Sequence, residues 1–246
     1  MIEWASSPLP LALLAPPAIE RFCVMEYLKS VLRLDFQEAL RPWLEFRDVV
    51  RIAGGDEKAE VQVGPVVIDR PSERTRVVVQ VRGVILEQEA PPSIEGGVRD
   101  AIEFMIALNG ASEFPKIGLM HHNTIFIEPY ELPFHELVAL LKAQCLRGTI
   151  ADDATDISLL LDQHEDGRKT HVQFGPMDAE QIKKEYLRWP PDDVPDTFVF
   201  LAVSYEATQE GSEFSSGLLE TFLEDAVRAE AAQADAIFGS LKENGG

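Results

Sequence analysis

Apolar and polar positions follow two periods in the first half of the chain, the alternation of strands and the wider spacing of helices. Short runs rich in β-branched residues predict strands, and longer runs with apolar residues on one face predict helices. The predicted elements are strands over residues 61–68 and 75–88, a helix over 93–109, a strand over 117–128 and a helix over 133–147. Gly110 is expected to end the first of these helices.

The second half of the chain repeats this order of elements. The predicted elements are strands over residues 156–163 and 169–175, a helix over 179–189, a strand over 197–207 and a helix over 215–241. Asp166-Gly167 between the two strands is a strong signal for a tight hairpin turn. Asp178 and Gln181 predict a capping box at the start of the helix that follows.

Residues near the N-terminus show a helical pattern. Phe22, Cys23 and Tyr27 lie near one face of a predicted helix over residues 18–34. A shorter helix is expected over residues 36–41, where it stops before a proline. Helices are therefore expected to precede the first strand.

This order of elements predicts an α+β protein with two tandem ββαβα units, of the split, ferredoxin-like kind, behind an N-terminal helical segment. The predicted boundaries are residues 1–54 for that segment, 55–150 for the first unit and 151–246 for the second. The duplication rests on element order, because the halves share no clear residue identity. It predicts equivalent or adjoining interior positions for strands 75–88 and 197–207, in two sheets or in one.

Charge narrows the range of partners. The chain has 246 residues and a formal net charge of −20. Residues 151–246 hold 21 acids and 7 bases, a net charge of −14, whereas residues 1–150 hold 21 acids and 15 bases, a net charge of −6. Such a surface repels phosphate backbones, so plain nucleic-acid binding is disfavoured. The acidity either attracts a basic protein partner or serves solubility.

Location is predicted from what the chain does not contain. No apolar run is long enough to span a membrane. Residues 1–17 are apolar, but they lack a basic start and are broken by prolines, so no secretory signal is expected. The two cysteines form no CxxC motif and fit a reducing compartment, which predicts a cytoplasmic protein.

Adjacent histidines at 121 and 122 suggest a metal site at first sight. On the predicted strand their side chains point to opposite faces, so they are not expected to share an ion. We predict that one histidine lies in the core and the other faces water, with no metal and no cofactor. His121 and Asn123 share a face, and together with Arg82 they are candidates to line a ligand cleft between the two units. The alternative is a hydrogen-bonded structural pair.

Other titratable groups are expected to have structural roles. The predicted hairpin sets His171 opposite Asp162 on its polar face, as a surface pair with no predicted nucleophile. Glu131 and His135 lie where a helix begins, which favours capping and solvation over metal binding. Cys145 falls in an apolar helical stripe and is expected to be an inert thiol. The chain has no nucleophile elbow, P-loop, dinucleotide fingerprint or HExxH motif.

Two groups of acidic side chains are the predicted contacts for a basic protein partner. They are Asp192, Asp193 and Asp196 in the loop after residues 189–191, and Glu220, Glu224 and Asp225 on the final helix. Two function classes follow. The first is a non-enzymatic interaction protein, acting as an assembly or regulatory accessory subunit. The second is a small-molecule-binding protein or enzyme that uses a cleft around His121 and Asn123.

Overall fold

The computed structural model describes residues 26–40, 65–91, 93–146, 154–165 and 167–243. These residues form an α+β fold built on one eight-stranded sheet in the order β2-β3-β4-β1-β5-β8-β7-β6. The strands are β1 (Glu26–Phe36), β2 (Val66–Arg70), β3 (Thr75–Gln80), β4 (Gly83–Glu89), β5 (Ile117–Pro129), β6 (Leu159–Glu165), β7 (Arg168–Asp178) and β8 (Thr197–Ser212). The strand pairs in this sheet are all antiparallel.

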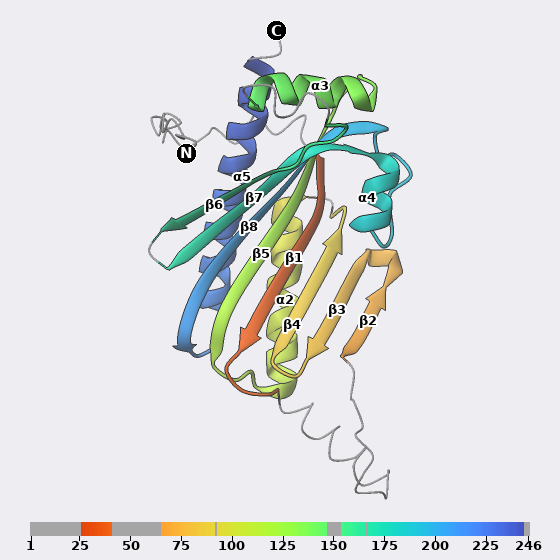
Figure 1. Cartoon of the computed structure of the whole chain (residues 1–246). Helices are drawn as coiled ribbons and strands as arrows, with labels where there is room; N and C mark the ends of the chain where they lie inside the picture. Colours follow the sequence, from red (N-terminus) through yellow and green to blue (C-terminus); the bar gives the residue numbers. More distant parts are fainter. Residues whose placement is uncertain (1–25, 41–64, 92, 147–153, 166, 244–246) are drawn as a thin grey trace, which may run out of the picture.

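Helices lie on both faces of this sheet, but they cover the two faces unequally. The helices are α2 (Ile94–Ser112), α3 (Phe134–Cys145), α4 (Ala179–Glu185) and α5 (Ser216–Glu243), with a short 3-10 turn, η2 (Pro71–Glu73), between β2 and β3. Figure 1 shows α2 and α5 behind the sheet, α3 across its top end and α4 at the upper right. We call the face packed against α2, α3 and α5 the helix face, and the opposite one the open face.

Side chains alternate between these faces and build the core. On the helix face, Leu32 of β1, Met105 of α2 and Phe222 of α5 belong to one buried cluster. Phe126 of β5 and Phe238 of α5 belong to a second cluster, where α3 also packs. The open face is covered at one end, where Ile182 of α4 packs against residues of β5 and β8. Most of the apolar burial is therefore on the helix face.

The predicted N-terminal helices are wrong where the structure describes them. Residues 26–36 form β1, in the middle of the sheet, and residues 37–40 are irregular. From Leu32 to Phe36 apolar and polar residues alternate, and Leu32, Leu34 and Phe36 are buried on the helix face. That short alternation outweighs the helical spacing of Tyr27 and the residues before it. Residues 18–25 and 41 lie outside the described part of the chain.

The run predicted as one strand over residues 75–88 is two strands. β3 and β4 pair with each other around a tight turn at Val81 and Arg82. Asp178 and Gln181 form the predicted capping box of α4. Gly110 does not end α2, which continues to Ser112. The first four residues of the strand predicted over residues 61–68 lie outside the described part of the chain.

The two predicted units share one sheet. β5 from the first unit pairs with β8 from the second, so the sheet is continuous across the predicted boundary at residue 150. The second unit contains two strands, a helix, a strand and a helix in the predicted order, whereas three strands precede the first helix of the first unit. In the second unit β7 of the hairpin pairs directly with β8, whereas β1 lies between β4 and β5 in the first. The structure therefore does not confirm the duplication or the split, ferredoxin-like arrangement.

Candidate functional site

The open face carries a row of polar side chains across its middle strands. Asp162 of β6 lies opposite His171 of β7, which lies opposite Ser204 of β8, which lies opposite Asn123 of β5. Asp162 Oδ1 is 2.6 Å from His171 Nδ1, and Asn123 Nδ2 donates to Ser204 Oγ at 2.6 Å. The predicted Asp162–His171 surface pair is confirmed. The hydrogen bond between them lowers the pKa of the Asp162 carboxyl.

A second polar row lies beside the first. Lys169 of β7, Glu206 of β8, His121 of β5 and Arg33 of β1 are successive cross-strand neighbours. His121 is half-buried, and burial lowers the pKa of its imidazole, against the opposing effect of the Glu206 carboxylate. The two rows give the open face charges of both signs within a short distance of each other.

The three predicted ligand residues are only partly brought together. His121 and Asn123 share the open face, as alternation requires. Arg82 lies in the turn between β3 and β4, and the backbone NH of Phe36 donates to its carbonyl at 2.8 Å. β4 and β1 stand between that turn and β5. Arg82 is thus not part of the His121 row.

His122 points the other way and is buried against α5. Its Nδ1 lies 2.9 Å from Oε2 and 3.1 Å from Oε1 of Glu230, and Thr124 Oγ1 donates to Glu230 Oε2 at 2.6 Å. His122 and Glu230 are exposed by 2% and 1%. The opposite placement of His121 and His122 is confirmed. A fully buried charge needs such partners, so this pair joins β5 to α5.

Further polar side chains continue from Glu230 across the helix face. Thr124, Ser30, Gln88 and Thr75 are successive cross-strand neighbours on β5, β1, β4 and β3. Ser30 Oγ lies 3.5 Å from Gln88 Oε1. Burial also raises the pKa of the nearby Tyr27, and the Glu230 carboxylate adds to that effect. Polar rows of this kind are unusual in a core and are tolerated when their groups are paired.

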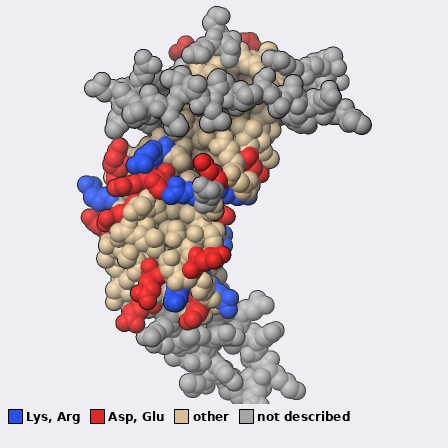
Figure 2. Space-filling view, turned by 90° about the vertical axis from the view of Figure 1, so that its left-hand side faces the viewer, with Lys and Arg blue, Asp and Glu red and all other residues tan. Residues whose placement is uncertain are grey.

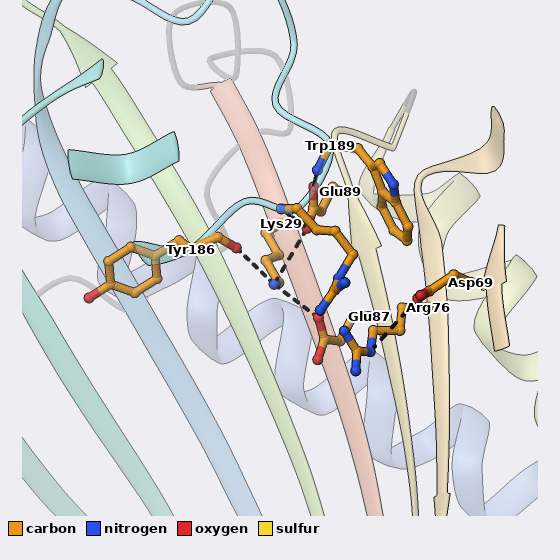
Figure 3. A network of polar contacts seen from close by, with 8 residues as sticks. Lys29, Asp69, Arg76, Glu87, Glu89, Tyr186 and Trp189 are labelled. Atoms are coloured by element: carbon orange, nitrogen blue, oxygen red, sulfur yellow. Dashed lines mark hydrogen bonds and ion pairs between the residues drawn. The ribbon is translucent and has the colours of Figure 1, made fainter. Parts of the chain in front are cut away.

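A charged network fixes the segment after α4 against the open face (Figure 3). Lys29 Nζ donates to the carbonyl of Tyr186 at 2.9 Å and to Glu87 at 3.1 Å, and it lies 3.7 Å from Glu89. The two carboxylate oxygens of Glu89 accept the backbone NH groups of Arg188 and Trp189, each at 2.8 Å. Burial raises the pKa of Glu89, partly offset by the hydrogen bond from Trp189 and by Lys29.

A hollow of about 790 Å³ lies between α2 and η2, away from the two open-face rows and at the Gln88 end of the helix-face row. Arg70, Arg74, Thr75, Gln88, Glu103 and Phe104 are among its lining residues. His121, Asn123 and Arg82 do not line it. Arg70 is paired with Glu73 at 3.1 Å and stands over the Phe104 ring, whereas Arg74 has no ion pair within the described part of the chain. This hollow is thus distinct from the predicted cleft.

The two predicted acidic groups lie on opposite faces. The loop with Asp192, Asp193 and Asp196 follows α4 on the open-face side, and all three are exposed. Glu220, Glu224 and Asp225 belong to α5 on the helix face. Asp225 is already paired, with Arg168 at 3.0 Å and Arg228 at 3.5 Å. Figure 2, which views the side where β6, β7 and α5 lie, shows basic side chains among the acidic ones.

Other predicted groups have structural surroundings. His135 is strongly exposed and lies 3.9 Å from Glu136 in the first turn of α3. Cys145 carries a free thiol in α3, and burial raises its pKa, which disfavours the reactive thiolate. Among the described residues no group of His, Cys, Asp or Glu has the spacing of a metal site. No described helix is long and apolar enough to cross a membrane.

Several residues that organise the site carry no signal in the sequence. Ser204 stands in a strand that reads as apolar on both faces, and its place beside His171 follows from the pairing of β7 with β8. Glu230 lies in a helix of many acids, and burial alone distinguishes it. Lys29 and Glu89 are far apart in the chain and meet because β1 pairs with β4.

The chain matches no protein-family model, no curated protein and no solved structure.

Proposed function

We propose that this chain is an assembly or regulatory accessory protein that binds a basic protein partner on the open face of its sheet. The unequal cover of the sheet supports this proposal. The helix face is packed against α2, α3 and α5, whereas α4 packs against only one end of the open face. Half-buried His121, Asn123 and Ser204 stand on the remainder. A broad, polar surface with some apolar contacts is typical of non-obligate protein interfaces.

Charge supports the choice of a basic partner. The chain carries a net charge of −20, and Asp192, Asp193 and Asp196 are exposed at the rim of the open face. Rim charges steer encounter and select partners of opposite sign. The same acidity disfavours nucleic acid as the ligand. The free thiol of Cys145 fits a cytoplasmic, reducing location for the complex.

The proposal is tested by quantitative capture from a lysate of the source cells with two matched charge-reversed proteins. Asp162→Lys with Glu206→Lys alters the open face, and Glu220→Lys with Glu224→Lys makes the same change in charge on α5. The amount of a specific partner that is captured should fall at least tenfold with the open-face variant and should be unchanged with the α5 variant. Equal capture by both variants, or selective loss with the α5 variant, contradicts the open face as the site.

The hollow between α2 and η2 favours a second candidate, a small polar ligand. Arg74 lines it without an ion pair to the described residues, and Gln88 and Thr75 add hydrogen-bonding groups. A carboxylate ligand would pair with Arg74. Thermal unfolding with a panel of small carboxylates tests this candidate, since a bound ligand raises the midpoint in the wild type but not in Arg74→Ala. Arg99→Ala, an exposed arginine of α2, is the matched control.

A further inference from the structure

The polar row on the open face has the composition and order of a nucleophilic triad. Asp162 Oδ1 lies 2.6 Å from Nδ1 of His171, and His171 stands directly opposite Ser204. Residues directly opposite each other on antiparallel strands bring their Cβ atoms to about 4.5–5.5 Å. Asp162, His171 and Ser204 therefore follow one another across neighbouring strands, in the order of carboxylate, imidazole and hydroxyl that general-base activation of serine uses. The structure has no hydrogen bond between His171 and Ser204, and such bonds often form only when substrate is bound.

Hydrogen bonding leaves the right atoms available. Asp162 engages Nδ1 of His171, so Nε2 is the ring nitrogen left to accept a proton. Asn123 Nδ2 donates to Ser204 Oγ from the β5 side at 2.6 Å. The Ser204 hydroxyl must then direct its own proton elsewhere, and His171 is its neighbour on the β7 side. Asn123 also sets an amide donor beside the oxygen that would attack.

Solvent reaches this row. The side chains of His171 and Asp162 are exposed by 40% and 54%, and Ser204 is half-buried. A substrate could therefore approach from the open face without any movement of the fold. Because water is not excluded, the donors act in a higher dielectric than in a closed active site, so the reaction should be slow.

We propose that Ser204 is a nucleophile for acyl transfer from ester substrates, with His171 as its general base and Asp162 as the positioning residue. Ser204 Oγ forms a bond to the ester carbonyl carbon while its proton passes to His171 Nε2. The bond from that carbon to the alkoxy oxygen breaks, and His171 returns the proton to the leaving oxygen. Water then attacks the acyl-serine, giving its proton to His171, which passes it to Ser204 Oγ as the carboxylic acid leaves.

The test uses the full chain and p-nitrophenyl acetate, followed by release of p-nitrophenolate and by peptide mass spectrometry. The expected result is one acetyl group on Ser204, with the burst of p-nitrophenolate lost in Ser204→Ala. Ser158→Ala is the matched control, because Ser158 Oγ on the same face also accepts from an amide, Gln173 Nε2 at 3.3 Å, but without a histidine triad. It should leave acylation unchanged. No acetylation of Ser204, or acetylation of Lys169 in its place, overturns the proposal.

The acylation rates of further variants distinguish the role of His171 from that of Asp162. His171→Gln should lower the acylation rate about 100-fold, in the range expected for loss of a general base. Asp162→Asn should lower it less, and Asp162→Glu should restore part of the loss, because the longer carboxylate can still hold the imidazole. Circular dichroism checks that each variant is folded. If the acylation rate is the same in the wild type and in the His171 and Asp162 variants, the assignment is wrong. This inference does not rest on the proposed partner, and either can fail alone.

Discussion

Nδ1 of His122 lies 2.9 Å from Oε2 of Glu230, and this buried contact joins the middle of the sheet to α5. Thr124 donates to the same oxygen at 2.6 Å. The carboxylate thus has partners from two residues of β5 while its helix packs over the core. Removal of either His122 or Glu230 leaves the other side chain buried without its partner. The free-energy cost of that unpaired group exceeds the net stabilisation that the contact itself provides.

Removal of the Glu230 carboxylate should destabilise the fold strongly. Glu230→Ala leaves His122 and Thr124 without their acceptor, so we expect a loss of about 3–5 kcal/mol in the free energy of unfolding. Glu230→Gln keeps one acceptor and should cost about 1–3 kcal/mol. Urea unfolding measures both, and Glu224→Ala, an exposed acid on the same helix, is the control. A Glu230→Ala variant as stable as this control contradicts the structural role.

The Glu89 carboxylate should protect two backbone amides from exchange. It accepts the NH groups of Arg188 and Trp189, so Glu89→Ala should speed hydrogen exchange in the segment that contains both. Glu87→Ala removes a neighbouring acid that contacts Lys29 instead, and it should leave this segment less affected. Mass spectrometry of short peptides measures the exchange. Unchanged protection in Glu89→Ala would show that the segment is held by its apolar contacts alone.

His121 should make the stability of the protein fall with acidification. Burial lowers the pKa of His121 below 6.5, so the unfolded chain binds a proton at a higher pH than the folded chain. Its contribution to stability is complete above 6.5 and is lost as the pH falls through the folded pKa. The free energy of unfolding measured between about pH 8 and pH 5 should therefore decline less in His121→Gln than in the wild type. His164→Gln, at an exposed histidine, is the control; parallel curves for wild type and His121→Gln contradict the prediction.

The Asp162 carboxyl should titrate below its ordinary value of 3.8, because of its hydrogen bond with His171. Carbon-detected NMR of the carboxyl follows this directly. In His171→Ala the titration midpoint should rise, and in Lys169→Ala it should rise less, since the lysine acts only through its charge. The depressed pKa means that the pair stabilises the fold above 3.8 and ceases to do so as the pH falls through the folded value. If the titration midpoint of Asp162 is the same in the wild type and in His171→Ala, the hydrogen bond is not the cause of the lowered pKa.

Local patterns predicted most of the described elements, the central strands β5 and β8 included. The apolar stripes of α2, α3 and α5, the Asp162–His171 pairing and the capping box of Asp178 all depend on residues close in the chain. The wrong prediction of a helix where the structure has β1 has a physical cause. Tyr27 and Val31 fit a helical face as well as a strand, and only long-range pairing with β4 and β5 decides between them.

The candidate site was predictable only where alternation along one strand or the register of the tight hairpin sufficed. His121, His122 and Asn123 could be assigned to faces from the strand period alone. Ser204, Glu230, Lys29 and Glu89 depend on which strands and helices become neighbours, and the sequence does not specify that order. The sequence also does not specify that Asp192 and Glu220 lie on opposite faces, because that placement depends on which face of the sheet each helix covers.

Charge at the rim should govern how fast the partner arrives. Charge reversal at Asp192, Asp193 and Asp196 should lower the association rate more than it raises dissociation. The Debye length falls from about 10 Å at 0.1 M salt to about 3 Å at 1 M, so the wild-type association rate should fall over that range. Surface-based kinetics with the captured partner measures both effects. An association rate that ignores salt and these substitutions means that the acidity serves solubility.

The docking of a partner on the open face is tested most directly by site-specific photocrosslinking in the source cells. A photoreactive phenylalanine analogue replaces Arg33 or Lys169 on the open face, or Ile106 or Glu220 on exposed positions of α2 and α5. We predict a crosslink to one and the same basic protein from Arg33 and Lys169, and none to that protein from Ile106 and Glu220. A crosslink to it from the helix positions but not from the open face would contradict the account.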